Sequence, residues 1–215
     1  MTGPAPHPVD SAAGRRAHWD GVYGSRTADQ MSWYQPRPGT SLALIERTGK
    51  GTDASIVDVG GGASLLVDAL LDRGFGRIAV LDISEAALGR ARARLGERAS
   101  RVRWIAADVT RWRPEGSFDI WHDRALFHFL VGERERETYR TLVSAAVPAG
   151  GQVVMGTFAA DGPERCSGLP VRRYDPGALS AELGPGFRLL EATTEDHVTP
   201  AGKVQRFQFC RFLRV

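Results

Sequence analysis

The segment IVDVGGGAS, residues 56–64, decides the fold, because a short apolar run turns here into three consecutive glycines. A run this short and apolar is typical of a buried strand. Gly60, Gly61 and Gly62 permit a tight turn and let a ligand approach the backbone before a helix begins. The segment therefore predicts a strand–turn–helix unit with a ligand at the turn. A tight turn without a ligand is the alternative interpretation.

Similar units follow along the chain. Apolar runs at 55–59, 77–82, 102–108, 118–123 and 151–158 alternate with helical segments at 65–72, 85–95 and 133–146. A helix at 175–183 then precedes two strands, 187–198 and 203–215, that a four-residue connection joins as a hairpin. Continuous apolar strands between helices indicate a parallel sheet covered on both faces. The predicted fold class is α/β: a doubly wound, seven-stranded Rossmann-like sheet with helices on both faces, ending in an antiparallel hairpin.

Composition narrows the class of protein. The 215 residues are 42% hydrophobic and 25% charged, which excludes collagen-like and wholly disordered chains. Only two cysteines occur, which excludes a disulfide scaffold and a four-thiolate zinc site, and no metal is expected. The net charge is +3, but only two of the 28 basic residues are lysines and the arginines alternate with carboxylates. We interpret this as coding bias in a GC-rich bacterial genome and a solvated surface, and expect no nucleic-acid partner.

The chain divides into three predicted parts: a disordered Pro-rich tail at 1–14, a helical N-terminal lid at 15–50 and a ligand-binding domain at 51–215. The lid contains predicted helices at 15–23 and 41–47. No apolar run suits a signal peptide, and none reaches the ~18 residues of a membrane span. We therefore expect a cytoplasmic protein with no membrane partner, either a monomer or a weak homodimer.

Three successive strands are predicted to end on a carboxylate: Asp58, Asp82 and Asp108. Ligands of open α/β sheets bind at the carboxyl ends of the strands. Asp82 stands 22 residues after Gly60, a spacing that suits a ribose diol. Asp58 suits an ammonium group, and Asp108 suits the exocyclic amine of a purine. A nicotinamide-dependent reductase is one alternative, although the third glycine of a dinucleotide fingerprint is replaced by Leu65.

The segments IVDVGGGAS, VLDIS and AAD resemble motifs I, II and III of class I S-adenosylmethionine-dependent methyltransferases. The resemblance implies that S-adenosylmethionine is the cofactor and that residues 51–215 are the domain that binds it. It also implies where the cofactor contacts lie: Asp58 at the methionine amino group, Gly60, Gly61 and Gly62 along the cofactor, Asp82 with Ile83 at the ribose, and Asp108 with Val109 at the adenine.

Two further segments resemble subgroups of that family. Asp123-Arg124 is similar to the Asp-Lys-Gly-Thr stretch of the eukaryotic methyltransferase-like lysine methyltransferases, although Ala125-Leu126 stands here in place of Gly-Thr. HWDGVY and SWYQ resemble their Trp-rich N-terminal segment and, more loosely, that of thiopurine methyltransferase. By this resemblance the lid closes over the site, with Trp33 on the cofactor, Gln35 at the rim, and Trp19, Tyr23, Tyr34 and Arg124 on the substrate.

The residues after the fourth strand are the candidates for catalysis. Asp123, also expected next to the cofactor, and His128 are predicted to orient or deprotonate the acceptor. Asp123 has a competing role as an acceptor of a hydrogen bond from the lid. His122 is interpreted as an interior histidine with satisfied hydrogen bonds.

The leading functional hypothesis is methyl transfer from S-adenosylmethionine to an S, N or O nucleophile of a small molecule, by in-line displacement. The insertion at 159–175 is expected to shape the acceptor pocket. Protein-lysine methylation is the main alternative. A catalytically silent cofactor-binding module or a nucleic-acid binder completes the set of alternatives.

Overall fold

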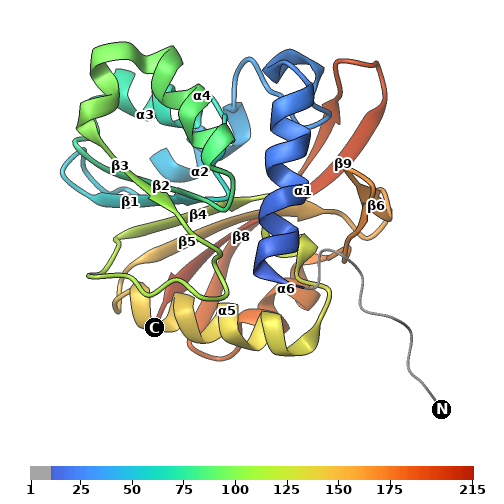
Figure 1. The fold of residues 1–215 in the computed structure, drawn as a ribbon. Coiled ribbons are helices and arrows are strands. Elements are labelled where there is room, and N and C mark those ends of the chain that lie inside the picture. Colours follow the sequence, from blue (N-terminus) through green and yellow to red (C-terminus); the bar gives the residue numbers. More distant parts are fainter. Residues whose placement is uncertain (1–10) are drawn as a thin grey trace.

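The computed structural model describes residues 11–215, which form a seven-stranded sheet in the order β3-β2-β1-β4-β5-β9-β8 (Figure 1). The first five strands in this order are parallel, β9 is antiparallel to β5, and β8 is antiparallel to β9. The strands are β1 (Ser55–Val59), β2 (Arg77–Asp82), β3 (Val102–Ala106), β4 (Ile120–Arg124), β5 (Gln152–Phe158), β8 (Phe187–Val198) and β9 (Val204–Arg214). The predicted doubly wound sheet with a terminal hairpin is confirmed.

Helices cover both faces of this sheet (Figure 1). The helices are α1 (Ala12–Ser25), α2 (Gly39–Glu46), α3 (Leu66–Asp72), α4 (Glu85–Leu95), α5 (Glu133–Ala146) and α6 (Pro176–Leu183). Shorter elements are the 3₁₀ turns η2 (Ala28–Gln30), η3 (Gly96–Arg101) and η4 (Phe127–Phe129) and the ribbon of β6 (Arg165–Cys166) and β7 (Leu169–Pro170). Apolar residues of α2, α3 and α4 pack on one face of the sheet, and those of α5 and α6 pack on the other.

The central strands are apolar on both sides because both of their faces are covered. Along β1, Ile56 joins the core under α2 and α3, whereas Val57 joins the core over α5 and α6. Along β5, Val154 belongs to the core under α2 and α3, and Val153 belongs to the core over α5 and α6. This burial on both faces explains why the strands read as continuous apolar runs and not as alternating ones.

The N-terminal helix begins earlier than predicted. Ser11 caps it by accepting a hydrogen bond of 3.0 Å from the backbone N–H of Gly14, and α1 runs from Ala12. Residues 12–14, predicted as part of a disordered tail, therefore belong to the helix, because the Ser11 hydroxyl satisfies a free N–H of its first turn. The prediction of disorder for residues 1–10 lies outside the described residues.

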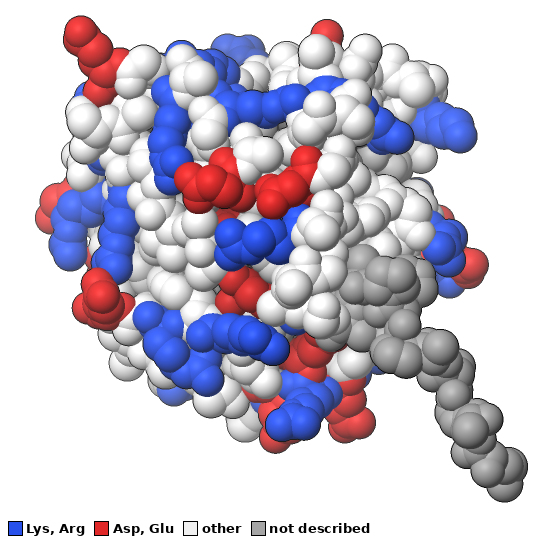
Figure 2. All heavy atoms as spheres, in the orientation of Figure 1, with Lys and Arg blue, Asp and Glu red and all other residues white. Residues whose placement is uncertain are grey.

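Several surface arginines form ion pairs with carboxylates. Figure 2 shows basic and acidic groups interspersed over the face that it draws. Arg94 lies 2.6 Å from Asp68, and Arg98 lies 2.5 Å from Asp72. Such pairing is typical of the solvated surface that the sequence predicted. Within residues 11–215, no helix is long and apolar enough to cross a membrane.

Candidate functional site

The glycine turn after β1 can be made only by glycine at two of its positions. Gly60 and Gly62 have positive φ angles of 72° and 47°. A Cβ atom on Gly60 would lie 2.7 Å from the Cβ of Leu126, and one on Gly62 would lie 2.5 Å from the hydroxyl of Tyr23. The turn therefore presents bare backbone between α1 and the loop after β4, as a close approach to a ligand requires.

Asp58, at the end of β1, belongs to a buried hydrogen-bonded chain with two other side chains. Its Oδ1 lies 2.7 Å from Nδ1 of His122, and Nε2 of His122 lies 2.9 Å from the hydroxyl of Ser41. The strand register places Asp58 beside His122, so the sheet itself sets this contact. His122 is thus an interior histidine with both ring nitrogens satisfied, as predicted. The chain fixes the orientation of the Asp58 carboxylate.

Asp82 ends β2 and is buried close to other acidic groups. Its Oδ1 accepts a hydrogen bond of 2.8 Å from the backbone N–H of Ser84. Burial, helped by the nearby carboxylates of Asp58 and Asp20, raises the pKa of Asp82 to about 7. A buried carboxylate of this kind is stabilised by a ligand that donates hydrogen bonds or brings positive charge.

Asp108 follows β3 and is already held by neighbours inside the chain. Its Oδ2 accepts hydrogen bonds from Nε and Nη2 of Arg15, at 3.2 and 2.7 Å. Its Oδ1 accepts from the backbone and the hydroxyl of Thr110, at 2.9 and 2.8 Å. Burial acts to raise the pKa of Asp108, but these hydrogen bonds outweigh it and the pKa lies below its usual range. The bonds to Thr110 also turn the chain here, so β3 ends at Ala106 and not at the predicted residue 108.

A cavity joins the ends of these strands to the N-terminal segment. Its walls are formed by Arg15, Trp19, Tyr23, Trp33, Gly60, Asp82, Ile83, Ala107, Asp108, Val109, Arg124, Ala125, Leu126, Phe129, Leu130 and Cys166. An adjoining cavity is lined by residues that include Tyr34, Gln35, Ser41, Asp58, Gly61 and His122, and shares Tyr23, Trp33, Gly60 and Arg124 with the first. Within residues 11–215, no group of three or more His, Cys, Asp or Glu side chains is placed to hold a metal ion.

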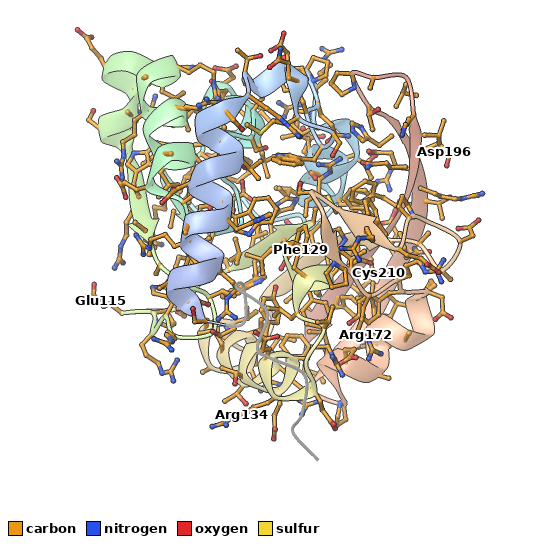
Figure 3. The ribbon with its side chains drawn as sticks, turned by 45° about the vertical axis from the view of Figure 1, so that its right-hand side comes forward. Glu115, Phe129, Arg134, Arg172, Asp196 and Cys210 are labelled. Carbon is orange, nitrogen blue, oxygen red and sulfur yellow. The ribbon has the colours of Figure 1, made fainter. Side chains whose placement is uncertain are left out.

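Aromatic residues of the N-terminal segment close the cavity from one side. The ring of Trp19 meets the rings of Trp33 and Phe129 edge-on, with centroids 5.8 and 5.1 Å apart. Phe129 lies near the middle of Figure 3, beside α1. Tyr23 also packs edge-on against Trp33, at 5.9 Å. The structure thus brings Trp19, Tyr23 and Trp33 together at the cavity.

The cavity divides into two chemically different halves. The half under β2 and β3 carries two carboxylates, Asp82 and Asp108. The half beyond β4 is apolar and aromatic, with Arg124 as its charged group. Between them, Ala125 adopts a left-handed conformation with φ of 66°, unusual for a residue with a side chain. Strained backbone of this kind concentrates at functional sites.

The structure places the two predicted catalytic side chains behind the wall of the cavity. Asp123 is fully buried, and its oxygens accept hydrogen bonds from the hydroxyl of Tyr139 at 2.6 Å and from the backbone N–H groups of Leu126 and Phe127. Burial raises the pKa of Asp123 to about 6. Its carboxylate fastens the turn after β4 to α5 and touches neither the lid nor the cavity.

His128 is equally remote from the cavity. It is fully buried, its Nδ1 accepts a hydrogen bond of 3.3 Å from the backbone N–H of Phe158, and its ring packs on those of Phe129 and Phe158. Burial lowers the pKa of His128 to about 3, so the ring is neutral at neutral pH and is a weak base. Because Nδ1 accepts a hydrogen bond, the single ring proton lies on Nε2. The geometry therefore favours structural roles for Asp123 and His128.

The residues at the two cavities that the sequence did not single out include Arg15, Ser41, Phe129 and Cys166. Arg15 and Ser41 come from helices whose docking on the sheet no local pattern predicts. Cys166 belongs to the insertion at 159–175, which was expected to shape an acceptor pocket, and it reaches the apolar half of the cavity. Phe129 directly follows the candidate residue His128. An aromatic side chain in the loop after the fourth strand could have indicated it as a cavity residue.

Parts of the chain match known methyltransferases in sequence. Residues 56–150 match the family model described as a methyltransferase domain. The chain is 26% identical over 130 residues to the eEF1A lysine and N-terminal methyltransferase of Mus musculus. This match takes in 59% of the chain and only 18% of that relative, so the chain spans less than a fifth of its length.

Solved structures share the fold. The 1,6-didemethyltoxoflavin-N1-methyltransferase of Burkholderia thailandensis, solved with 1,6-didemethyltoxoflavin and S-adenosylhomocysteine bound, superposes with a TM-score of 0.71 at 21% identity, over 100% of this chain and 93% of that one. A SAM-dependent methyltransferase of Anabaena variabilis superposes with a TM-score of 0.74 at 12% identity, over 100% and 98% of the two chains. The domain match takes in 95 of the 215 residues, and these solved structures show that the chain shares the fold of S-adenosylmethionine-dependent methyltransferases.

Proposed function

We propose that the protein transfers the methyl group of S-adenosylmethionine to an S, N or O nucleophile of a small molecule. The observation that carries this proposal is the divided cavity, with carboxylates at the strand ends in one half and an aromatic, apolar space in the other. The first half suits the cofactor and the second suits the acceptor. The glycine turn lies between them.

The residues of the first half fit the cofactor group by group. Asp82 lines this half and can accept from ribose hydroxyls, and Asp58, which lines the adjoining cavity, offers a fixed carboxylate to the methionine ammonium. Ile83 and Val109 supply apolar walls for the adenine, beside Asp108. When bound, the cofactor supplies a methyl group on a positively charged sulfur. The chain's own contribution is then to hold, orient and desolvate the two reactants, which accounts for ~7–11 kcal/mol in well-oriented reactions.

A small acceptor is favoured over a protein because aromatic side chains cover the second half of the cavity. Trp19 and Trp33 come from the N-terminal segment, Phe129 from η4 and Cys166 from the ribbon of β6 and β7. A lysine side chain on a folded protein would need an open approach through this cover. The relative from Mus musculus keeps protein-lysine methylation as the second candidate function.

A screen of acceptors tests the proposal. The protein is incubated with S-adenosylmethionine carrying an isotopically labelled methyl group, a panel of thiols, phenols, amines and carboxylic acids, and in parallel a mixture of folded proteins. Mass spectrometry should find the label on one chemical class of small acceptor. Label on protein lysines alone would overturn the proposal in favour of the second candidate.

A further inference from the structure

Arg124, the last residue of β4, is half-buried, and its guanidinium forms no ion pair with a carboxylate of residues 11–215. Its Nη1 donates to the backbone carbonyl of Trp33 at 3.1 Å, and its guanidinium lies over the ring of Phe207, 4.5 Å from the centroid. Its Nε and Nη2 are buried and have no hydrogen-bond partner among residues 11–215. Glu195 and Asp58 act on it only from longer range.

A buried arginine elsewhere in this fold has a carboxylate partner, although its Nε also makes no hydrogen bond. Arg136 on α5 forms an ion pair with Glu182 at 2.9 Å and donates to the carbonyls of Leu130 and Val131. A buried charge is costly unless it is paired and hydrogen-bonded. Arg124 lacks such a pair although it lines both cavities. The missing partner is therefore best supplied by a ligand.

The surroundings of Arg124 indicate where that ligand sits. The stack on Phe207 of β9 directs the guanidinium toward the β5–β9 side of β4, away from Asp82 and Asp108. This is the half of the cavity that we assign to the acceptor under the proposed function. Its other walls are Trp19, Trp33, Leu126, Phe129, Leu130 and the Cys166 thiol, whose pKa burial raises.

This half of the cavity also lacks a base. Among the described residues that line it, none is a histidine, lysine, aspartate or glutamate. A protonated amine would need such a base to remove its proton, and Arg124 would repel its charge. An anion needs no base and is attracted by Arg124. Its own electron pair forms the bond to the methyl carbon. The bond from that carbon to sulfur breaks with its electrons on sulfur, so the anion leaves as a neutral methylated product and no proton is transferred.

We propose that the acceptor is a planar aromatic anion, a thiolate or phenolate, that binds against the guanidinium of Arg124 among the rings of Trp19, Trp33 and Phe129. This inference rests on the proposed function for its assignment of the two halves. The aromatic rings offer edge and face contacts to a flat ligand, and the guanidinium offers two free donors to its charged atom. A neutral molecule of the same shape offers only weaker, uncharged acceptors to these donors, and a cationic one is repelled.

The test compares matched probes and variants. The probes are 4-nitrothiophenol and 4-nitrophenol, which ionise readily, together with 4-nitroaniline and benzylamine, which supply a neutral and a cationic nitrogen. The variants are Arg124→Gln, Arg124→Lys as the charge-retaining variant, and Arg172→Gln as the control. Arg172 lies near α6 in Figure 3, contacts Glu182 and Tyr174, and does not line the cavity.

Two readouts separate this inference from the proposed function. The first is equilibrium binding of each probe to protein saturated with S-adenosylhomocysteine, and the second is methyl transfer. We expect wild type and Arg172→Gln to prefer the two anions, and Arg124→Gln to lose roughly 10- to 100-fold in anion affinity with its S-adenosylhomocysteine affinity unchanged. Arg124→Lys should restore part of the loss. Anion binding that depends on Arg124 without any transfer would refute the proposed function and keep this inference.

Two results would overturn the inference itself. One is benzylamine or 4-nitroaniline binding or reacting as well as the anions in wild type. The other is a loss of S-adenosylhomocysteine affinity in Arg124→Gln as large as the loss of anion affinity, because the guanidinium would then serve the carboxylate of the cofactor.

Discussion

Replacing Asp82 by asparagine should change folding stability and cofactor affinity in opposite directions. The folded state raises the pKa of Asp82 from 3.8 to about 7, chiefly by burial. A carboxyl group shifted in this direction contributes its full stability below about pH 4 and loses it as pH rises to about 7. At pH 8 the ionised carboxylate therefore costs the free protein on the order of 4 kcal/mol. Asparagine avoids this cost, so Asp82→Asn should raise Tm by several degrees at pH 8.

The same substitution should weaken binding. Hydrogen bonds to a charged group contribute about 1.5–3 kcal/mol, so losing one from the ribose reduces affinity roughly 10- to 150-fold. Asparagine keeps an oxygen that can accept from the N–H of Ser84, which preserves the loop. In wild type, the affinity for S-adenosylhomocysteine should also fall about tenfold from pH 8 to pH 6, because the carboxyl group must first lose its proton. The variant should not show this dependence.

Calorimetric titration with S-adenosylhomocysteine and thermal unfolding, both at pH 6 and pH 8, measure these effects. Asp119→Asn is the control, because Asp119 accepts hydrogen bonds from Ser55 at the opposite ends of the strands. It should leave the affinity unchanged. Equal affinities of wild type and Asp82→Asn, or a lower Tm of the variant at pH 8, would refute the role given to Asp82.

Three other substitutions test particular contacts. Gly60→Ala places a Cβ atom 2.7 Å from Leu126 at a φ of 72°. Thermal unfolding should therefore show a loss of stability of about 1–3 kcal/mol, and calorimetry should show a weaker affinity for S-adenosylhomocysteine. Wild-type values would refute the close packing of the turn. Asp123→Ala leaves the hydroxyl of Tyr139 and the backbone N–H groups of Leu126 and Phe127 without an acceptor; at pH 5, where the carboxyl group of Asp123 with its pKa of about 6 is largely protonated, thermal unfolding should show a loss of about 1–3 kcal/mol. Its affinity for S-adenosylhomocysteine should stay within twofold of wild type; unchanged stability with a large loss of kcat would return Asp123 to a catalytic role. Trp33→Leu should weaken both S-adenosylhomocysteine and acceptor binding, since Trp33 lines both cavities; an effect on neither would remove it from the site.

The arrangement of the sheet and of its acidic strand ends could be predicted from sequence because both follow from local patterns. Strands buried on both faces are continuous apolar runs, so β1 and β2 begin and end at the predicted residues. The edge strand β8 also has the predicted bounds, although its residues alternate in exposure. The convergence of Asp58 and Asp82 follows once the strands are parallel, since their carboxyl ends then meet at one edge. The cytoplasmic location and the monomeric or weakly dimeric state stay predictions.

The directions of side chains after β4 could not be predicted in the same way. The turn η4 brings the ring of His128 into the core, where the backbone N–H of Phe158 holds it. Asp123 lies within β4 and faces Tyr139 of α5. The pairing of Arg15 with Asp108 joins residues 93 positions apart, and depends on how α1 docks. Contacts between residues so far apart leave no periodicity in the sequence. The spacing of the strands therefore indicated the carboxylates at the strand ends, but not the arginine that pairs with Asp108.

A crystal structure of the protein with S-adenosylhomocysteine bound tests the central claim most directly. The account predicts ribose hydroxyls within hydrogen-bond distance of Asp82, the amino group near Asp58, and the sulfur atom facing the space between Arg124 and Phe129. Adenosine lying in the aromatic half, or the homocysteine carboxylate bound to Nε and Nη2 of Arg124, would contradict the division of the cavity into a cofactor half and an acceptor half.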